Sequence, residues 1–376
     1  MASSYSIRDS LVNSPIREER NLFNIDPTLF ISLVLLCTIG LAVLYSATSG
    51  EMAAITRQSI RFALGFAVLI FLAQIPAKEL ARWSPWLYLL GIALLLVVMM
   101  IGYSGKGAQR WIDLGVVRFQ PSELLKIFLP MMVAWYFSEK PMPPTIPQIF
   151  IALIIIAIPV GLVLTQPDLG TALLIAFAGI CVIFLAGITW RLLAVFGGIA
   201  LASMPVFWFY LHDYQRQRIL TMLNPESDPL GTGYHIIQSK IAIGSGGVYG
   251  KGWLNGTQSQ LDFIPERSTD FIFAVFSEEF GFLGVVLLLC AYGFIVMRGL
   301  TIAARAKNTY SRLLAGSLSL SFFAYFLVNI GMVSGLLPVV GVPLPLISYG
   351  GTSAVTLLAA FGILMSIHSH RKFLSY

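Results

Sequence analysis

The chain of 376 residues is 57% hydrophobic and only 11% charged, with a mean hydropathy of +0.81. Soluble globular domains carry about 25% charged residues, so this composition excludes a soluble enzyme and indicates an all-α, polytopic integral membrane protein. The net charge of +6 does not indicate nucleic-acid binding, because the basic residues are dispersed among the loops between apolar runs.

Apolar runs recur along the chain, and a membrane-spanning helix needs about 20 mostly apolar residues. The hydropathy pattern predicts ten such helices, at 27–48, 59–75, 85–103, 120–138, 149–165, 168–187, 191–211, 271–298, 312–336 and 350–368. The first 26 residues are polar and lack the short apolar core of a cleaved signal peptide. We therefore expect a cytoplasmic tail at 1–26 and a single membrane domain at 27–376.

The distribution of Lys and Arg predicts which side of the membrane each loop faces. If the N-terminus is cytoplasmic, thirteen basic residues fall on the cytoplasmic side: Arg8, Arg17, Arg20, Lys78, Arg82, Lys140, Arg191, Arg298, Arg305, Lys307, Arg312, Arg371 and Lys372. Five fall in short outer loops: Arg57, Arg61, Lys106, Arg110 and Arg118. Both termini are therefore expected in the cytoplasm, and the long connection 212–270 is expected on the outer, periplasmic face between helices seven and eight.

Basic residues at the outer face form two short groups. KGAQRWIDLG places Lys106 and Arg110 close to Trp111, and YQRQR supplies Arg216 and Arg218 at the start of the long connection. Trp with Lys or Arg is also common at the level of lipid headgroups, so the first group has a simple anchoring interpretation. Several cations on one outer surface would suit a phosphate-bearing substrate, since guanidinium binds phosphate bidentately.

Three ionisable residues lie at or near membrane depth, where charged side chains tend to mark sites or pathways. Glu123 and Lys126 occupy RFQPSELLK, which begins the fourth helix, and their i, i+3 spacing allows an ion pair. Asp168 follows Pro167 in TQPDLGT, where helix capping is the favoured interpretation. The alternative is that Asp168 turns into the bundle and balances the charge of Lys126. Structural pairing and substrate contact both stay open.

The long connection contains two recognisable segments. HIIQSKIAIG places Ile237, Ile241 and Gly244 at i, i+4 and i+7, with Lys240 off that stripe, which predicts a short amphipathic helix. GSGGVYGKG at 244–252 resembles a phosphate-binding loop but lacks the required spacing of Gly, Lys and Ser or Thr. We expect flexible turns there.

PERSTDFIFAVFSEEFG sets charged residues directly against the apolar run of the eighth helix. Asp270 either caps that helix or provides a carboxylate for chemistry at its outer end, with Glu266 close by. Glu278 and Glu279 lie about 12 Å deeper at 1.5 Å per residue, and the sequence leaves their role open.

No metal or disulfide site is expected. All three cysteines, Cys37, Cys181 and Cys290, lie inside apolar runs, and the four His residues are scattered. No cofactor is assigned, although a divalent cation, Mg²⁺ or Mn²⁺, would be compatible with a pyrophosphate substrate.

Seven motifs together resemble the shape, elongation, division and sporulation (SEDS) family, from the third predicted helix to the tenth. They are KGAQRWIDLG, RFQPSELLK, TQPDLGT, HDYQRQR, PESDPLGTGYHIIQSKIAIGSGG, GKGWLNGTQSQLDFIPERSTDFIFA and VGVPLPLISYGGTS. The stretch GTQSQLDFIPER is similar to the elongation members rather than the division members. One departure is visible, because many relatives have His where this chain has Ser268, which argues against a histidine base at that position.

The resemblance implies a ten-helix peptidoglycan glycosyltransferase of the bacterial inner membrane, active on the outer face in cell elongation and rod-shape maintenance. It would polymerise lipid II by inverting transfer and release polyprenyl pyrophosphate. The family's essential acid falls on Asp270, here expected to act as general base. Its intramembrane set falls on Glu123, Lys126 and Asp168. Candidate substrate contacts from the residues themselves are Lys106, Arg110, Arg216, Arg218, Lys240 and Glu266.

The family also implies partners: a class B penicillin-binding protein with transpeptidase activity, and other proteins of the elongation machinery. Two further functions stay open from the sequence. A lipid II flippase would depend on Lys126 and Asp168 but not on Asp270. A scaffold without chemistry would recruit cell-wall enzymes and need none of these residues.

Overall fold

The computed structural model describes residues 24–105, 108–113, 118–211, 213–228, 231–261, 263–264 and 266–369. The long helices are α2 (Pro27–Ala47), α3 (Met52–Ala73), α4 (Ala77–Ile101), α5 (Pro121–Ser138), α6 (Ile146–Thr165), α7 (Leu169–Leu185), α8 (Trp190–Tyr210), α12 (Ile272–Ala304), α13 (Thr309–Val333) and α14 (Thr352–Ser369). A helix therefore lies in every one of the ten predicted apolar runs. Seven of them are long and apolar enough to cross a membrane, namely α2, α3, α4, α6, α12, α13 and α14.

Helix starts follow local sequence signals. Asp26 accepts hydrogen bonds from the backbone N–H groups of Thr28 at 3.1 Å and Leu29 at 3.4 Å, and Pro27 occupies the first turn of α2. Helix α3 begins at Met52 and α4 at Ala77, earlier than the hydropathy pattern predicts. Their first two turns carry polar residues such as Arg57 and Lys78, which a search for apolar runs leaves out of the helix.

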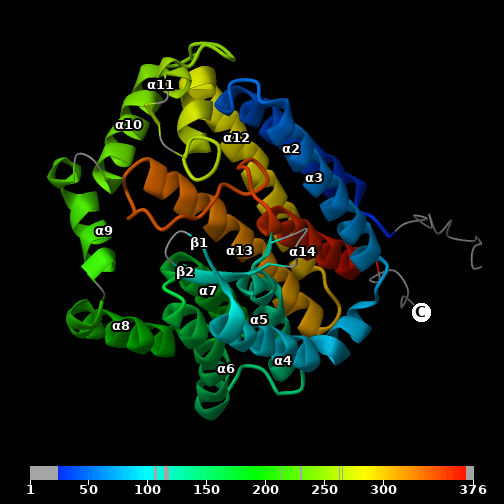
Figure 1. Ribbon diagram of the computed structural model, residues 1–376. Helices are drawn as coiled ribbons and strands as arrows, with labels where there is room; N and C mark the ends of the chain where they lie inside the picture. The colour runs from blue at the N-terminus through cyan, green and yellow to red at the C-terminus, as the bar shows by residue number, and fades with distance from the viewer. Residues whose placement is uncertain are drawn as a thin grey trace, which may run out of the picture.

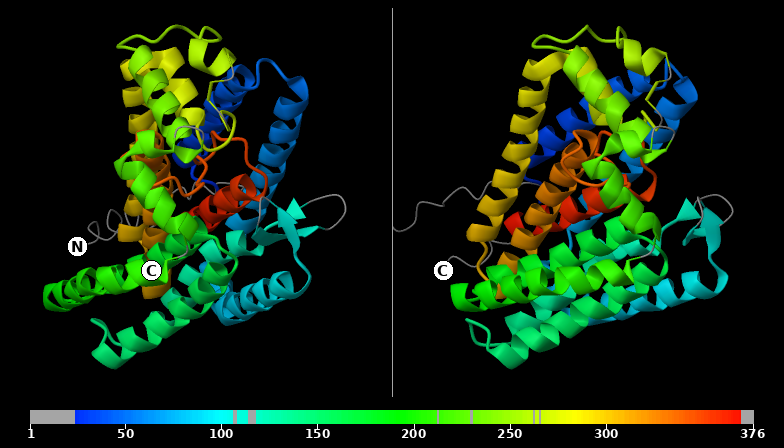
Figure 2. Two further views of the ribbon diagram at one scale, coloured as in Figure 1. Left: turned by 60° about the vertical axis from the view of Figure 1, so that its left-hand side comes forward. Right: turned by 90° about the vertical axis from the view of Figure 1, so that its left-hand side faces the viewer.

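The helices form two groups on either side of a central pair (Figures 1 and 2). Helices α13 and α14 lie between the α2–α3 pair and the group formed by α4, α5, α6 and α7, and α12 packs along α13. Helix α8 lies at the margin, with apolar side chains such as Trp190 and Phe209 largely exposed. Exposed apolar side chains on the outside of a helix bundle are what a lipid-facing surface requires.

A small antiparallel sheet interrupts the all-helical pattern that the sequence predicts. Strands β1 (Tyr103–Gly105), β2 (Ala108–Asp113) and β3 (Arg118–Phe119) pair in the order β1-β2-β3, between α4 and α5. Tyr103 pairs with Trp111, and Ile112 pairs with Phe119. These strands are too short for an alternating pattern to be recognised in the sequence. The sheet places Arg110 beside the start of α7.

The long connection between α8 and α12 contains helices α9 (Asp213–Leu223), α10 (Thr232–Ser245) and α11 (Thr257–Gln260) and the 3₁₀ helix η1 (Pro225–Ser227). Helix α10 confirms the short helix expected from HIIQSKIAIG. It packs against α12, and the connection runs along one side of the bundle to the N-terminal end of α12 (Figure 1).

The predicted turns after α10 are present, and their backbone is hydrogen-bonded to a break in α12. Gly281 has φ 63° and ψ −165°, a conformation that favours glycine. The break leaves backbone N–H groups of α12 without helical acceptors, and the turns supply them. The N–H groups of Phe282 and Leu283 donate to the carbonyls of Gly247 and Val248 at 2.9 and 3.1 Å. In the other direction, the backbone N–H of Lys251 donates to the backbone carbonyl of Glu278 at 3.0 Å.

Candidate functional site

Helix α5 carries the first part of the site, a buried ion pair. Lys126 Nζ lies 2.6 Å from Glu123 Oε1, as the i, i+3 spacing predicts, and both side chains are about one-tenth exposed. Thr356 of α14 donates its hydroxyl to Glu123 Oε2 at 3.2 Å. The Lys126 ammonium lies 4.8 Å from the centre of the Tyr325 ring of α13. Three helices thus hold this pair, and the charge of Lys126 is balanced by Glu123.

A cavity of about 30 Å³ opens beside this pair, lined by Glu123, Lys126, Tyr325 and Thr356 among mostly apolar side chains. The hydroxyls of Ser321 and Tyr325 are buried there without a hydrogen-bond partner in the described part of the chain. A cavity of this size with several polar groups has room for water.

Asp168 caps α7, which was the favoured interpretation of the sequence. Its Oδ1 accepts from the backbone N–H of Thr171 at 3.2 Å, and its Oδ2 accepts from Gln120 Nε2 at 3.1 Å. The cation beside it is Arg110 and not Lys126, with Arg110 Nη1 3.5 Å from Oδ2. The alternative pairing of Asp168 with Lys126 is therefore not what the structure contains.

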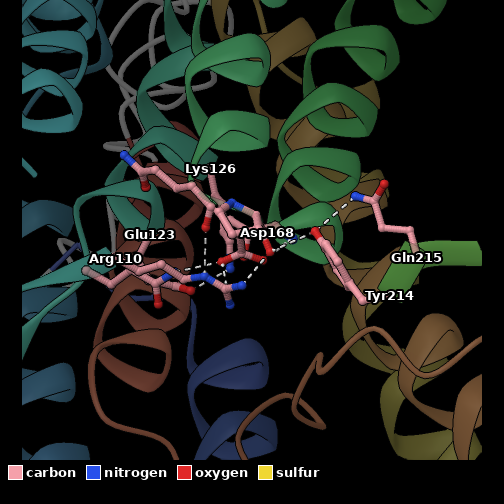
Figure 3. Close-up of polar contacts among 10 residues, drawn as sticks. Arg110, Glu123, Lys126, Asp168, Tyr214 and Gln215 are labelled. Atoms are coloured by element: carbon pink, nitrogen blue, oxygen red, sulfur yellow. Dashed lines mark hydrogen bonds and ion pairs between the residues drawn. The ribbon is translucent and has the colours of Figure 1, made fainter. Parts of the chain in front are cut away.

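Arg110 reaches from β2 across to the end of α6. Its Nε donates to the carbonyl of Gln166 at 3.1 Å, and its Nη2 donates to the carbonyl of Pro167. These two carbonyls follow the last turn of α6, where a helix leaves its acceptors unpaired. Arg110, Glu123, Lys126 and Asp168 gather in one place (Figure 3).

Helix α9 brings the start of the long connection to the same place. The Tyr214 hydroxyl donates to the Pro167 carbonyl at 3.5 Å, and Gln215 Nε2 donates to the Tyr214 hydroxyl at 3.0 Å (Figure 3). Arg218 lies over the Tyr214 ring at 5.7 Å from its centre. The Arg218 side chain therefore belongs to the rim of this cluster.

Arg216 has a different environment. Its Nε donates to the Trp208 carbonyl at 2.9 Å, and its Nη2 donates to the Phe209 carbonyl at 2.7 Å. Both carbonyls belong to the last turn of α8, so Arg216 satisfies acceptors at that helix end. Two of the guanidinium nitrogens of Arg216 are therefore already bonded within the protein.

Asp270 lies at the N-terminal end of α12. The helix N-cap is Phe271, one residue further on, so the interpretation of Asp270 as the N-cap is wrong. Its backbone carbonyl accepts from Asn329 Nδ2 at 2.8 Å, and its side chain is half-buried. A Cβ added to Gly341 would lie 3.5 Å from Asp270 Oδ2, so the carboxylate faces the segment that follows α13.

The other predicted residues lie in several environments. Glu266 is exposed, and its Oε2 accepts from the Thr269 hydroxyl at 2.7 Å. Lys240 is exposed on α10 and packs against Gly335 at the end of α13. The ring of His235, also on α10, stacks on Phe271 with 5.5 Å between ring centres. Lys106 lies outside the described residues.

One short segment connects Asp270 with the Asp168 cluster. A Cβ added to Gly170, in the first turn of α7, would lie 2.7 Å from the Val340 carbonyl. The next residue, Gly341, lies against the Asp270 carboxylate. Residues 340–342 therefore lie between the first turn of α7, which Asp168 caps, and the Asp270 carboxylate.

The structure gives a role to Glu278, which the sequence left open. Glu278 is fully buried, and its Oε1 lies 2.7 Å from Lys251 Nζ, so this carboxylate ties α12 to the long connection. Asn329 and Thr356 are residues that the sequence did not single out. Each is a polar residue inside an apolar run, and this pattern could have identified it as a candidate site residue. No group of three or more His, Cys, Asp or Glu side chains able to hold a metal ion occurs among the described residues.

Comparison with known proteins gives consistent matches along most of the chain. Residues 26–373 match the family model of the FtsW, RodA and SpoVE proteins, described as cell cycle proteins. The peptidoglycan glycosyltransferase MrdB of Escherichia coli K12 is 54% identical over 353 residues, which cover 94% of this chain and 95% of that protein.

Two solved structures are similar in fold. One is from a study of polymerization and crosslinking by a peptidoglycan synthase complex, with a TM-score of 0.82, 31% identity, and coverage of 93% of this chain and 99% of that one. The other is the rod shape determining protein RodA of Thermus thermophilus, with a TM-score of 0.71, 29% identity, and coverage of 93% and 98%. The chain therefore belongs to the FtsW/RodA/SpoVE family of cell cycle proteins, the SEDS family.

Proposed function

We propose that this protein is a peptidoglycan glycosyltransferase that polymerises lipid II into glycan strands during cell elongation. The observation that carries the proposal is the position of Asp270, a half-buried carboxylate where the long connection meets α12. The 54% identity to MrdB and the structural similarity to RodA support the reaction and the elongation role.

In this reaction Asp270 accepts the proton of the attacking sugar hydroxyl as a general base. The hydroxyl oxygen forms a bond to the anomeric carbon of the donor, the bond to the pyrophosphate breaks, and the configuration inverts. A positioned base typically contributes about 10²- to 10⁴-fold in rate. The departing pyrophosphate carries its own negative charge, so it needs cations rather than a proton donor.

Among the predicted cations in the described residues, Lys240 is the one that is exposed, so we assign the pyrophosphate contact to it. It is exposed on α10, the helix whose His235 ring stacks on Phe271 next to Asp270. Arg110 and Arg216 instead satisfy backbone carbonyls, which favours a structural role for both. The Glu123–Lys126 pair and Asp168 support the site from within the bundle.

The membrane arrangement is part of the proposal. All ten long helices cross the bacterial inner membrane, both termini lie in the cytoplasm, and residues 212–270 lie on the periplasmic side with the active site. The excess of basic residues in the cytoplasmic loops supports this orientation. The partner is a class B penicillin-binding protein whose transpeptidase crosslinks the new strands. The similarity to a chain from a peptidoglycan synthase complex supports that pairing.

The test is to purify the protein with its class B partner, add lipid II and measure glycan strands. The proposal predicts that the wild-type complex polymerises lipid II and that Asp270→Asn does not. A flippase would instead move lipid II across proteoliposomes, and this activity would survive Asp270→Asn and be lost in Lys126→Met. A scaffold would show neither activity.

A further inference from the structure

We propose that Ser348 and Asn329 are positioning residues for Asp270, acting on the backbone that carries it. This inference rests on the proposed function, in which Asp270 is the general base. Neither side chain needs to touch substrate in this role. Both lie after α12 in the chain, one on α13 and one in the segment between α13 and α14.

Three successive carbonyls leading into α12 each accept a hydrogen bond from this later part of the chain. The Ser268 carbonyl accepts from the backbone N–H of Tyr349 at 2.8 Å. The Thr269 carbonyl accepts from the Ser348 hydroxyl at 2.6 Å. The Asp270 carbonyl accepts from Asn329 Nδ2 at 2.8 Å. The segment is thus held residue by residue up to the proposed base.

Ser348 uses both hydrogen-bonding functions of its hydroxyl. While the O–H donates to the Thr269 carbonyl, the oxygen accepts from the backbone N–H of Leu344 at 2.7 Å. The residue is buried, with 4% of its surface exposed, so water does not readily replace either bond. Only a hydroxyl offers a donor and an acceptor from one atom in so small a side chain.

Asn329 joins the same two segments one residue later. Its amide nitrogen donates to the carbonyls of Asp270 at 2.8 Å and of Val342 at 2.7 Å, and the residue is fully buried. Both N–H bonds of the amide are therefore used. Gly341, the neighbour of Val342, lies against the Asp270 carboxylate. Asn329 therefore holds both the backbone of the proposed base and the segment that its carboxylate faces.

Asp270 needs these hydrogen bonds because the chain after it is buried and the chain before it is an exposed turn. After it, Phe271 and Ile272 are buried in the core. Before it, Glu266 is exposed with a positive φ of 53°, and Thr269 is bonded to Glu266 within one turn. A turn of this kind does not fix a carboxylate to a fraction of an ångström. A misplacement of about 1 Å can cost about 100-fold in rate.

The experiment compares Ser348→Ala with Ser348→Thr and with Ser317→Ala as matched control. Ser317 of α13 is also buried and donates its hydroxyl to a backbone carbonyl, that of Ala178 in α7, at 2.7 Å, so its bond joins α13 to α7 and not to the segment that carries Asp270. Each full-length variant is purified with the class B partner. The kcat and KM for lipid II polymerisation and the thermal stability are measured together.

We expect Ser348→Ala to lower kcat by about 10-fold or more without changing KM for lipid II, because the base is displaced while the binding surface is kept. Ser348→Thr keeps the hydroxyl and should restore most of kcat. Ser317→Ala should lose similar thermal stability and keep its kcat. Asn329→Asp removes both N–H donors and should resemble Ser348→Ala. If Ser348→Ala does not fold, Ser348→Cys keeps the volume with a weaker donor, and its kcat should be lowered.

Two results separate the inference from the proposed function. If Asp270→Asn is inactive while a folded Ser348→Ala or Ser348→Cys and Asn329→Asp polymerise at the wild-type rate, the positioning role is wrong and the general base stands. If Asp270→Asn polymerises normally, the proposed base is wrong. Equal losses of kcat in Ser348→Ala and Ser317→Ala, following their loss of stability, would also overturn the positioning role.

Discussion

Lys251 Nζ lies 2.7 Å from Glu278 Oε1, and this ion pair joins the long connection to the interior of α12. The same carboxylate accepts from the backbone N–H groups of Gln258 at 3.0 Å and Ser259 at 3.3 Å. These belong to α11, the last helix before Asp270. The buried acid of α12 therefore organises the path of the chain toward the proposed base.

Replacing Glu278 should loosen this part of the protein. Glu278→Ala leaves Lys251 and the two α11 amides without their acceptor, at a cost of about 3 kcal/mol. We expect faster hydrogen exchange at Gln258 and Ser259, measured by mass spectrometry. The control is Glu139→Ala, an exposed acid at the end of α5. Unchanged exchange at α11 in Glu278→Ala would show that the ion pair does not hold the connection.

The Glu123–Lys126 pair should behave as a coupled unit. Lys126→Met leaves a buried carboxylate without its cation and should destabilise the protein by about 3 kcal/mol. Adding Glu123→Gln removes that charge, so the double variant should recover much of the lost stability. Thermal unfolding in detergent measures both. A double variant that loses the sum of the two single effects would mean that the residues are not coupled.

Glycine at 281 is required by both backbone conformation and packing. Gly281→Ala places a Cβ in a conformation that favours glycine and against the backbone of Gly250, so we expect about 2 kcal/mol of destabilisation. Gly293→Ala on the same helix is the matched control, since nothing lies within 4 Å of its added Cβ. Thermal unfolding compares the two. The interlocked turns are not tightly packed if both variants have wild-type stability.

Arg110→Lys tests whether Arg110 is structural. Lysine keeps the charge but cannot reach the Gln166 and Pro167 carbonyls and Asp168 at once, because it lacks the planar fork. We expect thermal stability and polymerisation rate to fall together. The control is Arg312→Lys, an exposed arginine of α13. A loss of rate with full stability would assign Arg110 to substrate binding instead.

The positions of the helices could be predicted because apolar runs of helix length are rare outside membrane proteins. The Glu123–Lys126 pair followed from i, i+3 spacing, and the cap by Asp168 followed from its place before α7. Partners distant in the chain could not be predicted. Arg110 pairs with Asp168 through a sheet of very short strands, and its other contacts are backbone carbonyls, which no side-chain pattern reveals.

The surroundings of Asp270 show the same limit. Its location at the start of α12 could be predicted, because it is a charged residue directly before an apolar run. Ser348 and Asn329 were not selected as site residues, because they bind the backbone carbonyls of Thr269 and Asp270. Every residue has a backbone carbonyl, so no sequence pattern marks these two. The packing of the glycine-rich turns against α12 was also not predicted, since glycine permits both flexible loops and the close backbone packing seen at Gly250 and Gly281.

The most direct measurement is lipid II polymerisation by purified Asp270→Asn with the proposed class B partner, beside wild type and Asp213→Asn. Asp213 is a fully exposed acid at the start of the same connection, so it controls for the loss of one charge. We expect Asp270→Asn to make no glycan strands above background and Asp213→Asn to polymerise normally. Glycan strands made by Asp270→Asn at the wild-type rate would show that Asp270 is not the general base.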